Sequence, residues 1–189
     1  MASVKLTVKP LTPENWPDLE KVFGARGCSV ARGCWCMYYR RPAKMPPPPA
    51  GVTRAQRARR DLRALTRGAT PPGLIGYRGQ EPVGWISLGP REDYAYLERS
   101  RVMAPVDEKR VWSIICFVVP SEFRGEGVAH ELLRGAVAWA RKRGVKVLEA
   151  YPVIEGESLW FGTASMFTAA GFEEVARRKP DRPVMRLEL

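Results

Sequence analysis

The sequence predicts an α/β protein, with a single domain spanning residues 1–189 in which helices flank a mixed β-sheet. The length of 189 residues and the hydrophobic content of 45% suit one domain with an ordinary buried core. Strand-like and helix-like segments alternate along the chain. The strongest of them, Val111–Val119, is an almost unbroken apolar run, as expected for a strand buried on both faces.

Seven segments have the composition or alternation of strands. Alternation is cleanest in the last one, where Met185, Leu187 and Leu189 occupy every second position. A turn near Gly79 joins the second and third. The predicted strands are Lys5–Leu11, Leu74–Arg78, Val83–Leu88, Val111–Val119, Val145–Val153, Phe172–Ala176 and Val184–Leu189.

Four segments predict helices, and local signals mark their ends. Pro13 suits a first helical turn, and Thr53 with Gln56 three residues later forms a capping-box pattern. Gly144 and Gly171 suit helix C-termini. The predicted helices are Pro13–Phe23, a helix opened by Thr53 and reaching about Gly68, Gly125–Arg143 and Ser158–Ala170.

Three segments between these elements predict irregular structure. Gly24–Gly33 is glycine-rich, so we expect a loop. Four prolines at 46–49 predict a stiff extended link. Gly89–Arg110 predicts a long loop containing a helical turn, and loops of that length are often functional.

The chain is strongly basic, with 31 Lys and Arg against 20 Asp and Glu and a formal charge of +11. Such a charge can attract nucleic acid or phosphorylated ligands, but a solvated basic surface explains it equally well. For the arginine-rich helix after Thr53 we favour the solvated face and expect no nucleic-acid partner. The absence of a long apolar run and of a signal-peptide pattern predicts a cytoplasmic protein without membrane contact.

The cysteines do not predict a metal site. The chain has four of them, Cys28, Cys34, Cys36 and Cys116, and its one histidine is His130. The Cys34-Trp35-Cys36 spacing is too tight for the usual zinc clamp. We therefore expect reduced cysteines and no metal.

One short run has the character of a phosphate-binding loop. It is Arg124-Gly125-Glu126-Gly127-Val128-Ala129, and it stands between the apolar strand and a predicted helix. A helix start presents unpaired backbone N–H groups and a positive dipole end, and glycines let an anion approach them. The dinucleotide-binding pattern would need glycine at the position of His130. The alternative is a helix cap that is merely rich in glycine.

With these residues the sequence resembles the GCN5-related N-acetyltransferases. Their signature, [QR]-x-x-G-x-[GA] after a central strand, is matched by Arg124, Gly127 and Ala129. The segment from Met166 to Phe172 is similar to the family's second signature. The resemblance is good from about Val83 to Leu189, whereas the N-terminal third matches only in the order of its elements. It implies a mostly antiparallel sheet of six to seven strands.

The resemblance also implies a cosubstrate and a reaction. Acetyl-coenzyme A would pair its pantetheine arm with the strand backbone at Phe117, Val118 and Val119, and the amides from Arg124 to Ala129 would hold its pyrophosphate. A small-molecule or peptide amine would attack the thioester directly. A backbone N–H would polarise the carbonyl. The resemblance leaves open whether the protein forms a homodimer.

The residues that the family uses for proton transfer are missing here. Phe167 stands where a tyrosine acid is common, and Ser113 stands near the place of a carboxylate base. Glu149 and Tyr151, two apart on one strand face, are the predicted base and acid, although both could equally be structural. Cys116 and Ser165 are further candidates. Because the usual acid and base are absent, the alternative function is an acyl-coenzyme A sensor or interaction module.

The acceptor is not specified by any motif. Glu92 and Asp93 lie in the long loop and could attract a cationic amine. Aromatic residues could line an acceptor pocket or fill the core, and for each one we favour the core: Trp35, Tyr38, Tyr39, Trp85, Tyr94 and Trp112.

Overall fold

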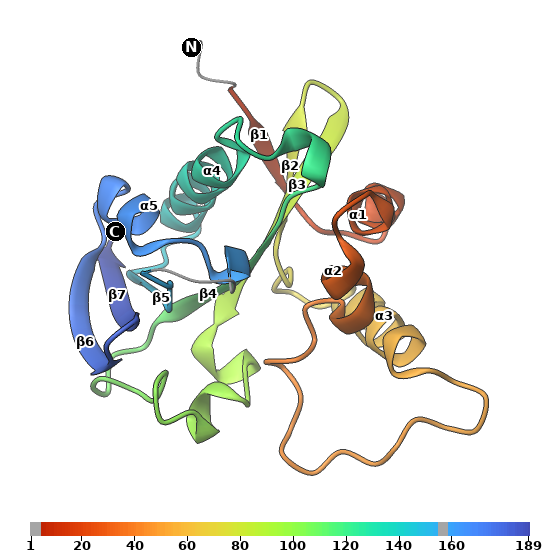
Figure 1. Cartoon of the computed structure of the whole chain (residues 1–189), viewed down its shortest axis with the longest axis horizontal. Helices are drawn as coiled ribbons and strands as arrows, with labels where there is room; N and C mark the ends of the chain where they lie inside the picture. The colour runs from red at the N-terminus through yellow and green to blue at the C-terminus, as the bar shows by residue number, and fades with distance from the viewer. Residues whose placement is uncertain (1–4, 155–158) are drawn as a thin grey trace.

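A computed structural model describes residues 5–154 and 159–189, and it contains one seven-stranded sheet (Figure 1). Its strand order is β1-β2-β3-β4-β5-β7-β6, so strands from both ends of the chain share it. The pairing of β4 with β5 is parallel and the other five are antiparallel. This confirms the predicted mixed, mostly antiparallel sheet. The strands are β1 Thr7–Pro10, β2 Leu74–Arg78, β3 Glu81–Pro90, β4 Trp112–Val118, β5 Val147–Ala150, β6 Glu173–Lys179 and β7 Arg182–Glu188.

Helices cover both faces of the sheet, as Figure 1 shows. On one face α4 buries Leu132 and Leu133 against strand residues such as Ile114. On the other face α1 buries Trp16 and Phe23 in a second cluster that includes Trp85 of β3. The helices are α1 Trp16–Gly24, α2 Ser29–Cys34, α3 Arg54–Leu65, α4 Val128–Lys142 and α5 Ala164–Ala169, with 3₁₀ turns η1 Arg91–Asp93, η2 Leu97–Arg99, η3 Ser121–Phe123 and η4 Leu159–Phe161.

The helix opened by Thr53 forms as predicted. The Gln56 amide donates to the Thr53 hydroxyl at 3.1 Å, and the Gln56 side chain accepts from the Thr53 amide at 2.8 Å. Its arginines have local partners: Arg59 pairs with Glu20, and the Arg63 guanidinium lies 5.8 Å from the Trp16 ring centroid. These contacts attach α3 to α1.

Three sequence predictions of local structure need correction. Gly24–Gly33 is not all loop, because Ser29–Cys34 forms α2 and buries Ala31. The predicted helix Ser158–Ala170 is broken into η4 and α5 by Gly162, whose φ is +76°; Ser158 itself lies outside the described residues. The helix predicted from Gly125 begins only at Val128, because Gly125 and Gly127 are left-handed.

The short pairing between β4 and β5 positions the candidate active site described below. It covers Trp112–Ile114 against Leu148–Ala150, after which β5 ends while β4 continues to Val118. A register shift opposite this part of β4, at Ser87/Leu88 of β3, bends the ladder. The second half of β4 therefore pairs with β3 on one side only, within the described chain, and its other edge is open.

Candidate active site

The run from Arg124 to Ala129 follows the open half of β4 and leads into α4. Gly125 and Gly127 have φ values of +79° and +80°, a conformation that only glycine adopts without strain. A Cβ placed on either glycine meets nothing within 4 Å, so their backbone faces open space. Within residues 5–154 and 159–189, the N–H groups from Gly125 to His130 donate to no acceptor. The run thus presents a row of free amides at a positive helix end.

Arg124 holds this loop in place. Its Nε donates to the Val119 carbonyl at 3.0 Å, and a terminal nitrogen donates to the Gly27 carbonyl at 2.7 Å. The side chain therefore joins the end of β4 to the α1–α2 connection and adds positive charge beside the free amides. The two backbone contacts were not predicted from the sequence.

Glu126 would repel an anion in this loop if its charge were unopposed. Its carboxylate pairs with Arg78 at the end of β2. Arg78 also lies over the Phe123 ring, 5.5 Å from the centroid. Because Arg78 neutralises Glu126, this carboxylate does not repel an anion from the neighbouring amides. Arg78 was not singled out from the sequence, since it lies 48 residues away from Glu126.

The strand residues predicted to bind pantetheine lie on the open half of β4. Phe117 and Val118 pair with Ile86 and Trp85 of β3, so their backbone is supported on one side. The Phe117 ring packs against Phe167, with centroids 6.1 Å apart. Phe167 is fully buried, which shows that the residue in the family's acid position is part of the core here.

Glu149 and Tyr151 share one face, as predicted, and lie at the centre of a buried polar network. The Tyr151 hydroxyl donates to Glu149 at 2.6 Å and lies 2.9 Å from the Ser113 hydroxyl. Arg91 and Arg186 reach the two oxygens of Glu149 at 3.1 and 2.7 Å. All five residues are buried, with Glu149 and Ser113 at 0% exposure. The roles of the two arginines were not predicted from the sequence.

This network constrains what the two side chains can do chemically. Both oxygens of Glu149 already accept from arginines, and breaking such contacts to accept a proton is costly. Burial, and then the charge of Glu149, raises the pKa of Tyr151 well above its ordinary value. The geometry therefore favours a role in positioning the β4–β5 junction over direct proton transfer.

The aromatic candidates divide into core and surface. Trp35, Trp85 and Tyr94 are buried. Trp112 packs against Trp139 of α4 with the rings tilted by 55° and their centroids 5.9 Å apart. Tyr38 is 51% exposed and Tyr39 is half-buried, and both join a surface cluster described below. Of the two acidic candidates, Asp93 pairs with Arg40 at 3.3 Å.

Three of the four cysteines meet on the α1–α3 side of β4. The Cys36 thiol interacts with both Cys34 and Cys116; the contact with Cys116, and then burial, raises the pKa of Cys36 well above its ordinary value, and the contact with Cys34 opposes that shift. Trp35 and Cys36 reach this place with left-handed φ values of 49° and 51°. All four cysteines are free thiols. Within the described residues, no group of three or more His, Cys, Asp or Glu side chains is arranged to hold a metal.

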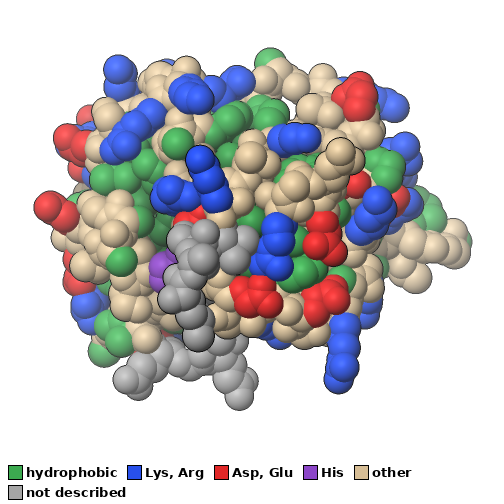
Figure 2. All heavy atoms as spheres, turned by 90° about the horizontal axis from the view of Figure 1, so that it is seen from above, with side chains coloured by type: hydrophobic (Ala, Val, Ile, Leu, Met, Phe, Trp, Pro, Cys, Tyr) green, Lys and Arg blue, Asp and Glu red, His purple; other side chains and the backbone are tan. Residues whose placement is uncertain are grey.

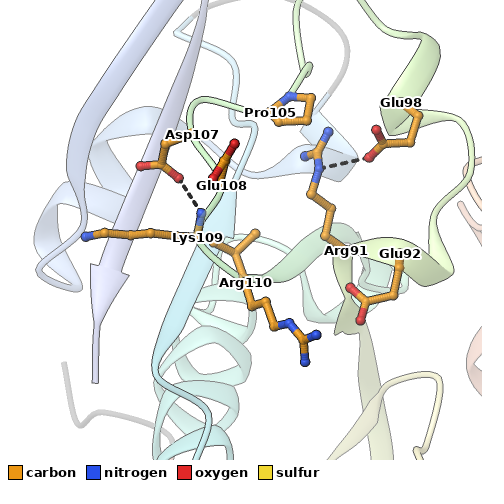
Figure 3. Close-up of a pocket in the computed structure, with 9 residues that line it drawn as sticks. Arg91, Glu92, Glu98, Pro105, Asp107, Glu108, Lys109 and Arg110 are labelled. Carbon is orange, nitrogen blue, oxygen red and sulfur yellow. Dashed lines mark hydrogen bonds and ion pairs between the residues drawn. The ribbon is translucent and has the colours of Figure 1, made fainter.

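A hollow of about 200 Å³ lies at the other end of β4 (Figure 3). In this view Arg91 points toward Glu98, and Asp107 accepts from the Lys109 amide. Because β4 has seven residues, its two ends are roughly 20 Å apart. The hollow is therefore remote from the free amides, and we assign it no part in binding the same ligand.

The basic side chains are dispersed on the face seen from above in Figure 2. Lys and Arg side chains alternate there with Asp and Glu, and no single basic patch dominates. None of the helices in residues 5–154 and 159–189 combines the length and apolar character of a membrane span.

The free amides, the left-handed glycines and the open strand edge define the class of protein. The sequence model of the acetyltransferase (GNAT) family matches residues 36–156, more than half of the chain. The chain therefore belongs to this family and is an N-acetyltransferase by class. No curated protein matches it by sequence.

Solved structures with the same fold include several acetyltransferases. An acetyltransferase from Thermus thermophilus has a TM-score of 0.57 and 21% identity, with 100% of both chains covered. A PaiA N-acetyltransferase from Thermoplasma acidophilum, in complex with coenzyme A, has a TM-score of 0.55 and 13% identity, covering 98% of this chain and 99% of its own. A ribosomal-protein-alanine N-acetyltransferase from Brucella melitensis has a TM-score of 0.55 and 20% identity, covering 96% and 99%. Identities this low indicate a shared fold.

Proposed function

We propose that the whole chain acts as one domain that transfers an acetyl group from acetyl-coenzyme A to a primary amine. The observation that carries this proposal is the row of free amides from Gly125 to His130, next to the open edge of β4. An anionic pyrophosphate suits the amides, and an extended amide-containing chain suits the strand edge. The coenzyme A complex of the Thermoplasma acidophilum protein supports the same ligand.

In this proposal the chain's own groups have separate tasks. Amides between Gly125 and Ala129 bind the pyrophosphate, with Arg124 fixing the loop. Backbone groups at Phe117, Val118 and Val119 hold the pantetheine arm. Bound acetyl-coenzyme A supplies an activated thioester. A backbone N–H on the open edge of β4 would stabilise the oxyanion formed when the amine attacks.

The sequence predicts Glu149 and Tyr151 as base and acid, but the buried network around them favours a different role, which we propose in its place. Ser113 on β4 and Glu149 on β5 are paired neighbours, and Tyr151 bridges them. We propose that these residues hold the point where the two strands separate. The acceptor would then lose its proton to water or arrive as the neutral amine.

The phosphate loop can be tested by a pair of glycine substitutions. Gly127→Ala forces an alanine into a left-handed conformation and adds a methyl group in front of the free amides. Gly144→Ala has the same conformational cost, since its φ is +73° and its Cβ also meets nothing, but it lies at the far end of α4. Each should lose about 1–2 kcal/mol of stability, measured by urea denaturation.

Only Gly127→Ala should weaken coenzyme A binding, by at least tenfold, in calorimetry at a temperature where both variants are folded. Equal affinity in the two variants would remove the basis of the proposed site. Release of free coenzyme A thiol across a panel of primary amines then tests the transfer itself. Tight coenzyme A binding without turnover of any amine would favour a sensor over an enzyme.

A further inference from the structure

Five aromatic side chains form a cluster beside the place where β4 and β5 separate. The rings of Tyr38, Tyr39 and Tyr96 are mutually 5.1 Å apart between centroids. Phe161 is 5.6 Å from Tyr39, and Trp160 is 5.9 Å from Phe161. Tyr38 and Trp160 remain 51% and 40% exposed, so part of this aromatic cluster faces solvent.

The aromatic cluster adjoins the predicted thioester site through its inner members. Phe161 belongs to the same buried cluster as Ile115 of β4 and Tyr151, against which Tyr39 packs. The next residue, Gly162, is so near β4 that a Cβ there would lie 3.3 Å from Phe117. The N-terminal part of the cluster is held to the 91–110 segment, because the Tyr96 amide donates to the Tyr39 carbonyl at 3.0 Å (Figure 1).

Two arginines border the aromatic cluster. The Arg182 guanidinium lies 4.1 Å from the Phe161 centroid, and that of Arg99 lies 5.3 Å from the Tyr96 centroid. Arg99 also donates to the backbone carbonyl of Arg41. In the described part of the chain, no carboxylate forms an ion pair with either arginine. Asp181, next to Arg182, is paired with Lys179 at 3.1 Å.

Arg182 is the arginine of this pair that reaches the β4–β5 junction. It starts β7 and donates to the carbonyl of Tyr151, just past the end of β5. Its Nε is buried and has no acceptor among the described residues. Burial lowers the pKa of Arg182, although the charges of Tyr39 and Asp181 oppose that shift. The side chain is half-buried, and an anionic ligand would give its Nε a charged acceptor.

We propose that the acceptor is a primary amine that also carries a carboxylate, bound by Arg182, with its apolar part resting on the aromatic cluster. Arginine binds carboxylates through two parallel hydrogen bonds, and aromatic rings favour a flat or aromatic substituent. A doubly cationic amine would meet these two arginines without a compensating carboxylate. This inference rests on the proposed amine acetylation and specifies its substrate class.

Two acceptors of nearly the same shape provide the test. 4-(Aminomethyl)benzoate and 4-methylbenzylamine are both benzylic amines, and only the first has a carboxylate. Thiol release should give a kcat/KM at least about tenfold higher for the benzoate, the usual effect of a hydrogen bond to a charged group. Titration of each amine into the coenzyme A complex, by calorimetry, should show the same preference without requiring turnover.

Arg182→Gln should abolish this preference by raising KM for the benzoate, and Arg182→Lys should restore only part of it. Arg177→Gln is the matched control, because Arg177 is on β6 and pairs with Glu174. It should keep the wild-type ratio. Melting temperatures of the variants establish that they are folded.

The proposal is overturned if the wild-type protein binds or acetylates 4-methylbenzylamine as well as 4-(aminomethyl)benzoate. It is also overturned if Arg182→Gln leaves the ratio unchanged. Both outcomes are compatible with acetyl transfer to another amine. Failure of the wild-type protein to bind coenzyme A at all would instead contradict the proposed function.

Discussion

At the scale of single residues, Glu149 is the buried carboxylate that compensates the charge of two arginines. It is the carboxylate that faces both Arg91 and Arg186 at the β4–β5 junction. Exposed ion pairs contribute little to stability, but removing one member of a buried network leaves uncompensated charge. Its importance for folding therefore follows from burial rather than from the number of its partners.

Glu149→Gln should destabilise the protein by about 3–5 kcal/mol, because it removes the buried carboxylate that both guanidinium groups share, and their other partners, Glu98 and Asp107, are exposed. Glu98→Gln is the matched control, since Glu98 also pairs with Arg91 but is 57% exposed. It should cost less than about 1 kcal/mol. Urea denaturation measures both values, and similar losses in the two variants would contradict this account of the network.

The same variant separates positioning from base catalysis. A missing general base typically reduces the rate by about 10²–10⁴. If Glu149 holds the strand junction instead, the folded Glu149→Gln protein should retain most of its kcat at a temperature well below its transition. A loss of a hundredfold or more in folded protein would identify Glu149 as the base.

At the scale of elements, helix α3 depends on its first turn. Thr53→Ala removes the hydroxyl that accepts from the Gln56 amide and should cost about 1 kcal/mol of stability. Thr53→Asn keeps a capping oxygen and should be close to neutral. Thermal unfolding compares the two; equal melting temperatures would show that the cap is not needed once α3 packs on α1.

Elements were predictable from the sequence where local signals decide them. The capping box of α3 and the strand before Pro120 are such cases, and so is the phosphate loop, whose parts are contiguous. The break at Gly162 was missed because it depends on close contact: a Cβ there would lie 2.5 Å from the Met166 side chain. Helix α2 was missed because its stability comes from burying Ala31 against distant residues, not from its glycine-rich sequence.

The candidate site was likewise predictable where its residues are contiguous and unpredictable where they come from distant segments. Its cosubstrate half follows from a short motif, whereas its other half is assembled from separate segments. Arg91 lies 60 residues before Tyr151, and Arg182 lies 31 residues after it. Arg186 follows four positions beyond Arg182, and neither of these two arginines belongs to a recognisable pattern. Only the antiparallel pairing of β7 with β5 places the last two beside the junction.

At the scale of the whole molecule, buried thiols and phenols make folding sensitive to alkali. Burial raises the pKa of Tyr94, and burial is also the first cause for Tyr151. The pKa values of Cys34 and Cys36 are raised as well, chiefly by contacts between neighbouring thiols. A raised pKa means that the unfolded chain loses the proton first and binds fewer protons than the folded chain.

Stability should therefore be complete below about pH 9 and fall as the pH rises, first through the thiols and above about pH 10 through the phenols. Each group contributes a slope of about 1.4 kcal/mol per pH unit. Urea midpoints at pH 8, 9, 10 and 11 measure the fall. Tyr94→Phe should reduce it between pH 10 and 11 by about that amount and leave the change from pH 7 to 8 unaltered. A flat profile would contradict the burial of these groups.

The open edge of β4 has a consequence for how the protein behaves in a crowded solution. Unpaired strand groups are a template for strands of other molecules, and edges of this kind promote aggregation unless something covers them. Here η4 lies beside β4, but Gly162 approaches that strand only at the Phe117 ring, so the edge itself stays unpaired within the described chain. Under the proposed function the pantetheine arm lies along this edge, so the groups that bind the cosubstrate are the same ones that would leave the unliganded protein prone to self-association.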